Sequence, residues 1–308
     1  MEEVKEVQET VTESKVIKAP KAMNVKEISA KAKTGKIIAQ VLTYTFLILV
    51  AIAVLFPFYW MLNSSLKSLE EYRLASPTFW PHAMQFTNYV SAFTTANLGR
   101  LFLNTMYVGI VSTLLSLVIT VLSAFAFARL EFKGREIMFA ILLATMMIPG
   151  ELFTITNYAT VFSFGWQNTF TALIVPFLVS VFYIYLLRQN FKQIPNELYL
   201  AAKVDGTGDF KYLLKVMVPL ALPQLISITI LKMMGAWNSY IWPRLVANDE
   251  AHRMITNGLR NAFTASTGDI DYPVQMAAVA LVSLPLFIVF ICCRKYIMKG
   301  VSRSGIKG

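Results

Sequence analysis

Long stretches without a charged residue are the feature that most limits what this chain can fold into. Uncharged runs of 30, 28 and 22 residues occupy 37–66, 101–128 and 272–293. A fourth stretch, 137–187, has 51 residues and is interrupted only by Glu151. About 20 apolar residues in a helix cross the hydrocarbon core of a bilayer. The first three runs therefore each predict one transmembrane span.

The fourth stretch is long enough for two spans joined by a short polar turn at 163–168. A further span is expected from Val216 to Trp242, with Lys232 inside it. The sequence therefore predicts an all-α polytopic membrane protein with six transmembrane helices over residues 37–293.

The composition excludes a water-soluble globular protein. Only 15% of the 308 residues are charged and 56% are hydrophobic, whereas about a quarter of the residues in soluble domains are charged. Cys292 and Cys293 are the only cysteines and are adjacent. Their position excludes a disulfide-stapled secreted module.

The distribution of Lys and Arg predicts that both ends of the chain lie in the cytoplasm. Segments on one side of the predicted spans have 21 of these residues and segments on the other side have 6, and cytoplasmic loops have the excess. Residues 1–36 are expected to be a disordered cytoplasmic tail, and residues 294–308 a cytoplasmic C-terminal tail. The net charge of +10 then belongs to the inner surface and indicates the lipid bilayer, and not nucleic acid, as a partner.

The sequence has no residue pattern typical of an enzyme. A GxxxxGK[ST] phosphate-binding loop is absent, so this chain is not expected to bind ATP by that motif. His82 and His252 lack the paired spacing of a metal site, and we expect neither a catalytic residue nor a metal nor a cofactor here. A secondary transporter is the competing class. It would usually have inverted repeats and several intramembrane acids, whereas Glu151 is the one acid within a predicted span.

The 189–219 segment, between the predicted fourth and fifth spans, predicts a short amphipathic helix. Pro195 and Asn196 are typical of a helix start, and Glu197 suits the positive N-terminal end of a helix. Asp205-Gly206 predicts the end, because glycine readily adopts the left-handed conformation after the last turn. A second short helix is expected to begin near Asp209.

Two small residues, Ala201 and Ala202, lie with Leu198 on the apolar face of this predicted helix. They leave a shallow surface that a groove on another protein can approach closely. A helix lying on the bilayer surface is the alternative, although alanines are poor membrane anchors.

The spacing of this segment resembles the EAA loop of ABC importer membrane subunits. In that loop Glu-Ala-Ala is followed by three residues, a glycine, nine residues and Ile-x-Leu-Pro. Here Ala201-Ala202 is followed by three residues, Gly206, nine residues and Val216–Pro219. Leu200 stands at the position of the motif's glutamate, and its side chain cannot make the polar contacts of a carboxylate.

Other segments resemble the carbohydrate-uptake branch of these importers. They are WNSYIWP (Trp237–Pro243), IPG (Ile148–Gly150), GWQNT (Gly165–Thr169) and the C-terminal KGVSRSGIKG. The chain is similar to the smaller membrane subunit of maltose- and multiple-sugar-type importers over roughly residues 37–308.

This resemblance implies a type I ABC importer permease fold in a bacterial cytoplasmic membrane. The implied partners are a second homologous permease subunit, two copies of an ATPase subunit that bind ATP and Mg, and an extracytoplasmic sugar-binding protein. The implied solute is an oligosaccharide of the maltose, raffinose or multiple-sugar class. A permease for another solute and a secondary transporter remain the alternatives.

The resemblance also implies roles for particular positions. The residues implied to couple to the ATPase are Glu197, Ala201, Ala202, Asp205, Gly206 and Pro219. Those of the tail implied to contact the ATPase are Ser302, Gly305, Lys307 and Gly308. The outer loop 244–271 is implied to contact the binding protein.

Four residues in and just after the predicted fifth span are candidates for the solute pathway, three near its outer end and Lys232 in mid-span. They are Trp237, Asn238, Tyr240 and Lys232. Aromatic rings can stack on the apolar face of a sugar, and an intramembrane charge is costly enough to suggest a function. The alternatives are an aromatic belt at the membrane boundary, an asparagine bonded to another helix and a lysine at a subunit interface.

Overall fold

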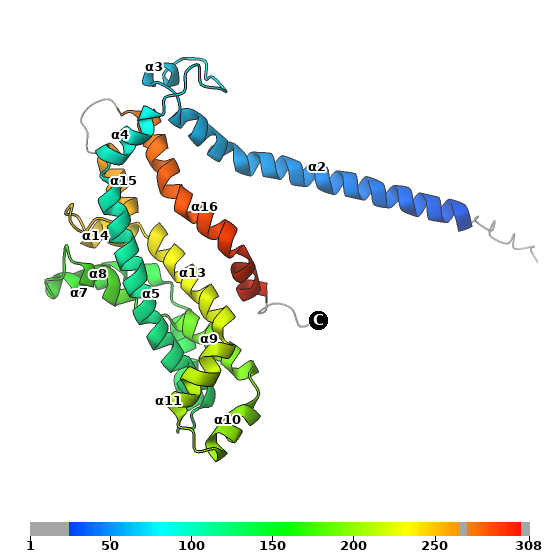
Figure 1. Cartoon of the computed structure of the whole chain (residues 1–308), viewed down its shortest axis with the longest axis vertical. Helices are drawn as coiled ribbons and strands as arrows, with labels where there is room; N and C mark the ends of the chain where they lie inside the picture. The colour runs from blue at the N-terminus through cyan, green and yellow to red at the C-terminus, as the bar shows by residue number, and fades with distance from the viewer. Residues whose placement is uncertain (1–24, 265–269, 303–308) are drawn as a thin grey trace, which may run out of the picture. The chain divides into compact units, whose positions relative to one another are not determined.

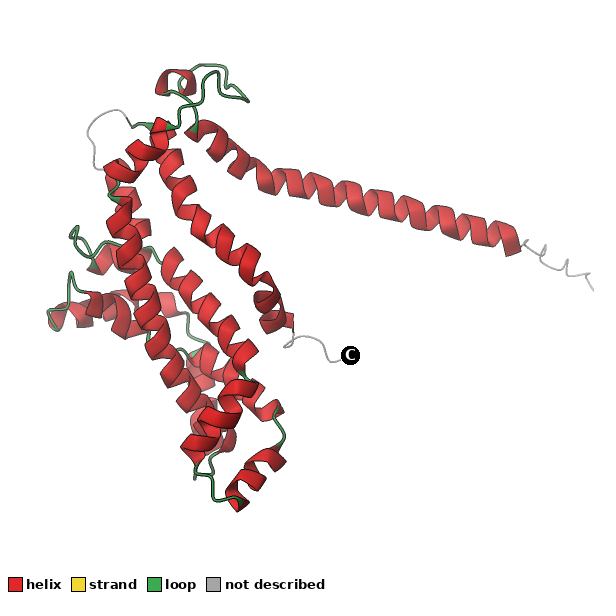
Figure 2. Ribbon diagram, in the orientation of Figure 1, coloured by secondary structure: helices red, strands yellow, loops and turns green. Residues whose placement is uncertain are grey.

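A computed structural model describes residues 25–264 and 270–302 of the chain (Figure 1). Within these residues all regular structure is helical, and Figure 2 shows helices joined by loops. The chain divides into two units, one ending at Tyr59 and the other beginning at Trp60. The first 24 residues of the predicted N-terminal tail lie outside the described residues, as do Gly305, Lys307 and Gly308.

The first unit consists of most of α2 (Val25–Ser65), a helix of 41 residues. Side chains between 36 and 59 are exposed although they are mostly apolar. A helix that is apolar on all sides is typical of a membrane span. The helix begins ahead of the predicted boundary at residue 37, because the Lys, Ala and Glu residues before it are good helix formers.

In the second unit, α5 (Leu98–Arg129) packs against α9, α13 and α15 (Figure 1). Small and hydroxyl side chains dominate the middle of its buried face. They are Gly109, Ser112, Thr113, Ser116, Thr120 and Ala124. Such residues let membrane helices approach closely, which explains why α5 can contact several helices.

Three further candidate spans are helix pairs that bend by 82°, 45° and 79°. Their members are α6 (Arg135–Thr145), η1 (Gly150–Phe153) and α7 (Thr154–Ser163); α8 (Phe170–Ile174), η2 (Val175–Phe177) and α9 (Val181–Gln193); and α11 (Asp209–Tyr212), η3 (Leu213–Met217), α12 (Val218–Leu220) and α13 (Leu222–Asn238). Pro149, Pro176 and Pro219 lie at or near the three breaks, because proline lacks the N–H that a continuous helix needs. With each pair counted as one span, the described residues have up to six candidate spans, in agreement with the sequence.

The remaining helices lie before, between and after these spans. They are α3 (Leu69–Tyr72), α4 (Thr87–Thr95), α10 (Asn196–Val204), α14 (Ile241–Val246), α15 (Ile255–Thr264) and α16 (Tyr272–Ser302). The last of them continues through residues predicted as a tail from 294, and Ser302 is its final residue. α16 packs against α4 and α13.

Two buried arginines join α5, α6 and α9 at one end of the second unit. Arg129 Nη2 donates to the carbonyl oxygens of Phe191 (2.8 Å) and Ile194 (2.5 Å). Arg188 Nη2 donates to both carboxylate oxygens of Glu136, at 2.8 and 2.7 Å. The C-terminal carbonyls of α9 therefore bind directly to α5, next to the start of the 189–219 segment.

Candidate functional site

The 189–219 segment contains the two short helices that the sequence predicts. α9 continues to Gln193, and α10 then covers Asn196–Val204. The α10 helix ends at Val204, and Gly206, just after the C-cap residue Asp205, has a left-handed φ of +72°. The amide of Thr207 donates to the Ala202 carbonyl (2.8 Å) and that of Gly206 to the Lys203 carbonyl (3.0 Å), the pattern of a Schellman motif. The predicted helix end is confirmed.

A cluster of three side chains, Tyr199, Lys203 and Asp209, joins α10 to α11. The Tyr199 hydroxyl donates to Asp209 Oδ1 (2.7 Å), and Lys203 Nζ lies 2.6 Å from the same oxygen. The bond to this carboxylate raises the pKa of Lys203, and burial together with the same carboxylate raises the pKa of the Tyr199 phenol. This cluster is not among the residues predicted from the sequence. The i, i+4 spacing of Tyr199 and Lys203 on one helix face was the available signal.

Apolar side chains make up most of the exposed face of α10 between its ends. Leu200 is 56% exposed and Val204 is 89% exposed. Ala201 is also exposed, whereas Ala202 is half-buried and packs on the chain's own core. The two alanines therefore do not share one outward surface. Consecutive helical residues are about 100° apart around the axis.

The other predicted coupling residues lie at different places. Glu197 and Asp205 are exposed at the two ends of α10. Pro219 is exposed in α12, beside the 79° bend into α13, and not in the projecting helix.

A cavity of about 350 Å³ lies among α5, η2, α9, α13 and α14. Its polar lining residues are Ser112, Ser180, Tyr183, Lys232 and Ser239, and Trp242 contributes an indole. Lys232 Nζ donates to the carbonyl oxygen of Phe177 (2.6 Å), where the α8–η2 segment breaks before α9. In a continuous helix the Phe177 carbonyl would accept a hydrogen bond from a backbone amide, but at this break it is available to Lys232.

Of the four candidate pathway residues, only Lys232 lines this cavity. The Trp237 ring is 6% exposed and packs 5.4 Å from the Phe102 ring, within the core formed with α4, α15 and α16. A helix turns by about 100° per residue. Five residues therefore place Trp237 about 140° away from Lys232 on α13, on a different face of the helix.

Asn238 and Tyr240 lie beyond the cavity. Asn238 is exposed and donates to the Met234 carbonyl of its own helix (3.0 Å). The Tyr240 hydroxyl accepts hydrogen bonds from Arg244 (2.8 Å) and Arg260. Neither residue is among the cavity's lining residues.

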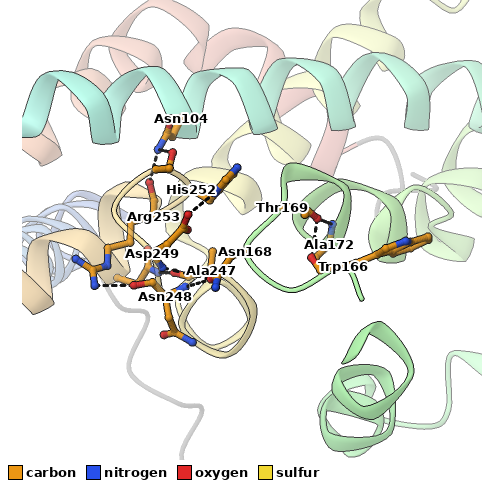
Figure 3. Close-up of polar contacts among 12 residues, drawn as sticks. Asn104, Trp166, Asn168, Thr169, Ala172, Ala247, Asn248, Asp249, His252 and Arg253 are labelled. Atoms are coloured by element: carbon orange, nitrogen blue, oxygen red, sulfur yellow. Dashed lines mark hydrogen bonds and ion pairs between the residues drawn. The ribbon is translucent and has the colours of Figure 1, made fainter. Parts of the chain in front are cut away.

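A polar network at the ends of α5, α8 and α14 holds the loop that precedes α15 (Figure 3). Asn168 Oδ1 accepts hydrogen bonds from the amides of Asn248 (2.8 Å) and Asp249 (3.3 Å). From α5, Asn104 Nδ2 donates to the carbonyls of Ala251 (2.9 Å) and Arg253 (2.8 Å). The network explains the polar GWQNT segment, because an asparagine there binds backbone 80 residues away.

His252 belongs to the same loop. Its Nδ1 lies 2.8 Å from Asp249 Oδ2, and its ring contacts the Phe170 ring at 4.7 Å. In the part of the chain that the structure describes, no group of three or more His, Cys, Asp or Glu residues is arranged to hold a metal ion.

Comparison with known proteins identifies the family. Residues 116–303 match the family described as "Binding-protein-dependent transport system inner membrane component". The chain is 31% identical to the diacetylchitobiose uptake system permease protein NgcG of Streptomyces coelicolor, over 85% of this chain and 87% of the relative. It is 30% identical to the arabinooligosaccharides transport system permease protein AraQ of Halalkalibacterium halodurans, over 90% of this chain and all of the relative.

A solved structure has the same fold. The crystal structure of a bacterial ABC transporter that imports the acidic polysaccharide alginate includes a chain that superposes with a TM-score of 0.78. The match covers 85% of this chain and 97% of that chain at 22% identity. From the family match, the two relatives and this fold, we conclude that the chain belongs to the binding-protein-dependent inner membrane components and is a permease subunit of an ABC importer.

Proposed function

We propose that this chain forms half of the translocation pathway of an oligosaccharide importer in the bacterial cytoplasmic membrane. A second, homologous permease subunit supplies the other half, and an extracytoplasmic binding protein delivers the sugar to the outer loop 244–271. Two copies of a separate ATPase subunit bind ATP and Mg and drive the transport cycle. The names of the two relatives, which refer to diacetylchitobiose and to arabinooligosaccharides, support the solute class.

The exposed apolar helix α10 is the observation that carries the proposal. In Figure 1, α10 and α11 lie at one end of the group formed by α5, α9 and α13. Leu200 and Val204 expose apolar surface there. The same helix has Glu197 in its first turn and Lys203 in its last turn. Apolar side chains that face water favour a protein partner that covers them. We assign this partner as the ATPase.

The contacts support a path by which movement of α10 reaches the cavity. The Tyr199, Lys203 and Asp209 cluster joins α10 to α11, and η3 and α12 lead from α11 into α13. α13 carries Lys232 into the cavity. Gly206 sets the turn between the two short helices, and Pro219 lies at the bend. Displacement of α10 therefore moves the wall of the cavity.

The coupling residues are thus Glu197, Ala201, Asp205 and Gly206 in and around α10, with Ala202 packing inward and Pro219 at the bend. The proposed orientation places this segment and both chain ends in the cytoplasm. The C-terminal residues Ser302, Gly305, Lys307 and Gly308 then lie on the same side of the membrane as the ATPase and are proposed to contact it.

A charge on the exposed face of α10 tests the proposal. Val204→Glu alters a side chain that is 89% exposed and should leave the fold intact, while it places a charge in the proposed interface. Burying a valine contributes about 1.5–3 kcal/mol, so retention of the ATPase should weaken at least about tenfold. The measurement is copurification of the ATPase with the tagged permease pair, together with sugar uptake in proteoliposomes.

The matched control is Phe164→Glu, which changes another exposed apolar residue in the turn between α7 and α8. It should retain the ATPase like the wild type. Equal ATPase retention and uptake for Val204→Glu and wild type would overturn the assignment of α10 as the ATPase-binding helix.

A further inference from the structure

We propose that the cavity beside Lys232 receives an acidic group of the imported solute, a carboxylate, phosphate or sulfate, and that the solute is therefore an acidic saccharide. This inference rests on the proposed function, because it treats the cavity as part of the translocation pathway. It adds a charge class that the names of the two relatives do not specify, although the solved structure with the same fold belongs to a transporter involved in the import of an acidic polysaccharide.

The charge balance of the cavity is the first observation. Lys232 is the one basic residue among those that line the cavity, and none of the lining residues is acidic. Among the described residues, no carboxylate lies within ion-pair distance of its Nζ. A charged residue at membrane depth is costly unless a counter-charge or water reaches it. The cavity therefore favours an anion.

The geometry of Lys232 leaves room for that anion. An ammonium group has three N–H donors, and the structure gives Nζ one acceptor, the Phe177 carbonyl at 2.6 Å. The ring centre of Tyr183 lies 5.9 Å from Nζ. One hydrogen bond thus positions the ammonium group at the cavity wall, and its remaining donors are available to a bound group.

The N-terminus of α9 is a second positive feature at the same cavity. α9 has 13 residues, and Ser180 precedes its first turn and accepts a hydrogen bond from the Tyr183 amide (3.5 Å). Both residues line the cavity. The N-terminus of a helix has a partial positive charge, and broken membrane helices in transporters point such ends at anionic groups of the substrate. Lys232 and the N-terminus of α9 therefore both attract an anion into the same cavity.

Other lining groups suit the remainder of a saccharide. The hydroxyls of Ser112 and Ser239 can exchange hydrogen bonds with sugar hydroxyls, and the Trp242 indole, held by its Nε1 bond to the Ala172 carbonyl (2.9 Å), provides an aromatic ring. An acidic sugar unit can bind the positive groups through its charge, the serine hydroxyls through its own hydroxyls and the indole through the apolar face of its ring.

The charge of the cavity can be measured with thiol reagents of opposite charge. The complete importer is prepared in nanodiscs with every native cysteine replaced and with Ser239→Cys as a single reporter in the cavity. A sulfonate-bearing methanethiosulfonate and its trimethylammonium counterpart are applied, in the absence of nucleotide and with ATP trapped. Phe164→Cys, an exposed position in the turn between α7 and α8, is the control reporter outside the cavity.

We expect the sulfonate to react with Ser239→Cys faster than the trimethylammonium reagent by at least about tenfold, the lower limit of electrostatic focusing in a cleft. Lys232→Met should abolish this ratio and Lys232→Arg should preserve it, with no effect of either at Phe164→Cys. Glucuronate, and not glucose, should slow the modification of Ser239→Cys, and Lys232→Met should remove that protection.

Other results overturn the inference in distinguishable ways. Equal rates for the two reagents with Lys232 present mean that another group neutralises the lysine. If Lys232→Met then favours the cationic reagent, this group is a carboxylate of the second permease subunit. Each of these results, like a lack of protection by glucuronate, would exclude an acidic solute. None of them would contradict the proposal that the chain imports an oligosaccharide. If Ser239→Cys reacts with neither reagent in any nucleotide state of a transporting complex, the cavity is not the pathway.

Discussion

Two glycines in the loop after α10 have different roles at the scale of single residues. Gly206 has a φ of +72°, whereas Gly208 has a φ of −69° and a ψ of 155°. A Cβ added to either glycine would meet no atom within 4 Å. Any difference between substitutions at the two positions therefore comes from backbone conformation and not from steric contact.

Gly206→Val should uncouple ATP hydrolysis from transport. The left-handed conformation costs a residue with a Cβ roughly 1–2 kcal/mol, and a β-branched side chain is especially unfavourable there. The turn that orients α10 should therefore change. The measurement is sugar uptake per ATP hydrolysed in proteoliposomes. Gly208→Val is the control, because its extended backbone suits valine. Equal coupling ratios for the two variants would contradict the role of the turn.

Glu71 illustrates how one buried carboxyl group organises the loop between α2 and α4. Its carboxylate accepts hydrogen bonds from Thr78 Oγ1 (2.7 Å) and from the amide of His82 (3.1 Å). Burial alone raises the pKa of this carboxyl, but the bonds from Thr78 and His82 outweigh it, and the pKa lies below its usual value. The carboxylate form is therefore the one that stabilises the loop.

The pH dependence of this loop follows from the lowered pKa. A group whose pKa falls on folding stabilises the folded state fully above its unfolded pKa, which for Glu is about 4.3. Protection of residues 71–82 in hydrogen exchange, corrected for intrinsic rates, should be constant from neutral pH to about that value and should decrease below it. Glu71→Gln should show weaker protection without this pH step. The same pH step in the variant would contradict the role of Glu71.

At the scale of elements, α15 approaches α5 closely at a residue that has no side chain. Gly258 of α15 packs on Leu101 of α5, and an added Cβ would lie 2.3 Å from Leu101 Cδ2. Leu101 is itself buried, 5% exposed. The contact between these two helices therefore depends on the absence of a side chain at residue 258.

Gly258→Ala should destabilise the packing of α15 on α5. Overpacking of a close contact typically costs about 1–3 kcal/mol, so the midpoint of thermal unfolding of the detergent-purified protein should decrease. Gly150→Ala is the control, because an added Cβ there meets no atom within 4 Å. In the double variant Leu101→Ala with Gly258→Ala, the loss of stability should be smaller than the sum of the losses in the two single variants. No decrease for Gly258→Ala would show that α15 can shift without cost.

At the scale of the whole molecule, the broken helices raise a topological question. Each of the three bent pairs can cross the membrane or re-enter on the same side. The excess of Lys and Arg, 21 against 6, favours complete crossing, because it places both ends of the chain and the 189–219 segment on one side.

Reporter fusions should show six crossings. Fusions after Lys36, Phe132 and Lys203 should report the cytoplasm, and fusions near Gln85, Phe164 and Ala262 should report the outside. The Phe164 fusion is the sharpest test, since it lies just after the pair that bends by 82°. An inside signal there would show that α6 and α7 form a re-entrant loop, and the six-span topology would be wrong.

Much of the fold could be predicted from the sequence, because its causes are local. An uncharged run of sufficient length must be a membrane helix, since no water is available to its backbone groups. Proline near each break and glycine at the end of α10 determine backbone conformation at their own positions. The apolar segments, the two short helices of the 189–219 segment and the left-handed Gly206 were accordingly predicted from residues adjacent in the chain.

Only the tertiary structure decided which face of each helix packs in the core and which face lines the cavity. The sequence placed Trp237 and Lys232 together as pathway candidates, but Trp237 packs in the core and Lys232 lines the cavity. The choice depends on contacts with α5, η2 and α16, which are far away in the sequence. The bonds of Asn168 to residues 80 and 81 positions later also depend on tertiary packing. Hydropathy and local conformation specify the elements, whereas side-chain environment depends on the packing of all of them together.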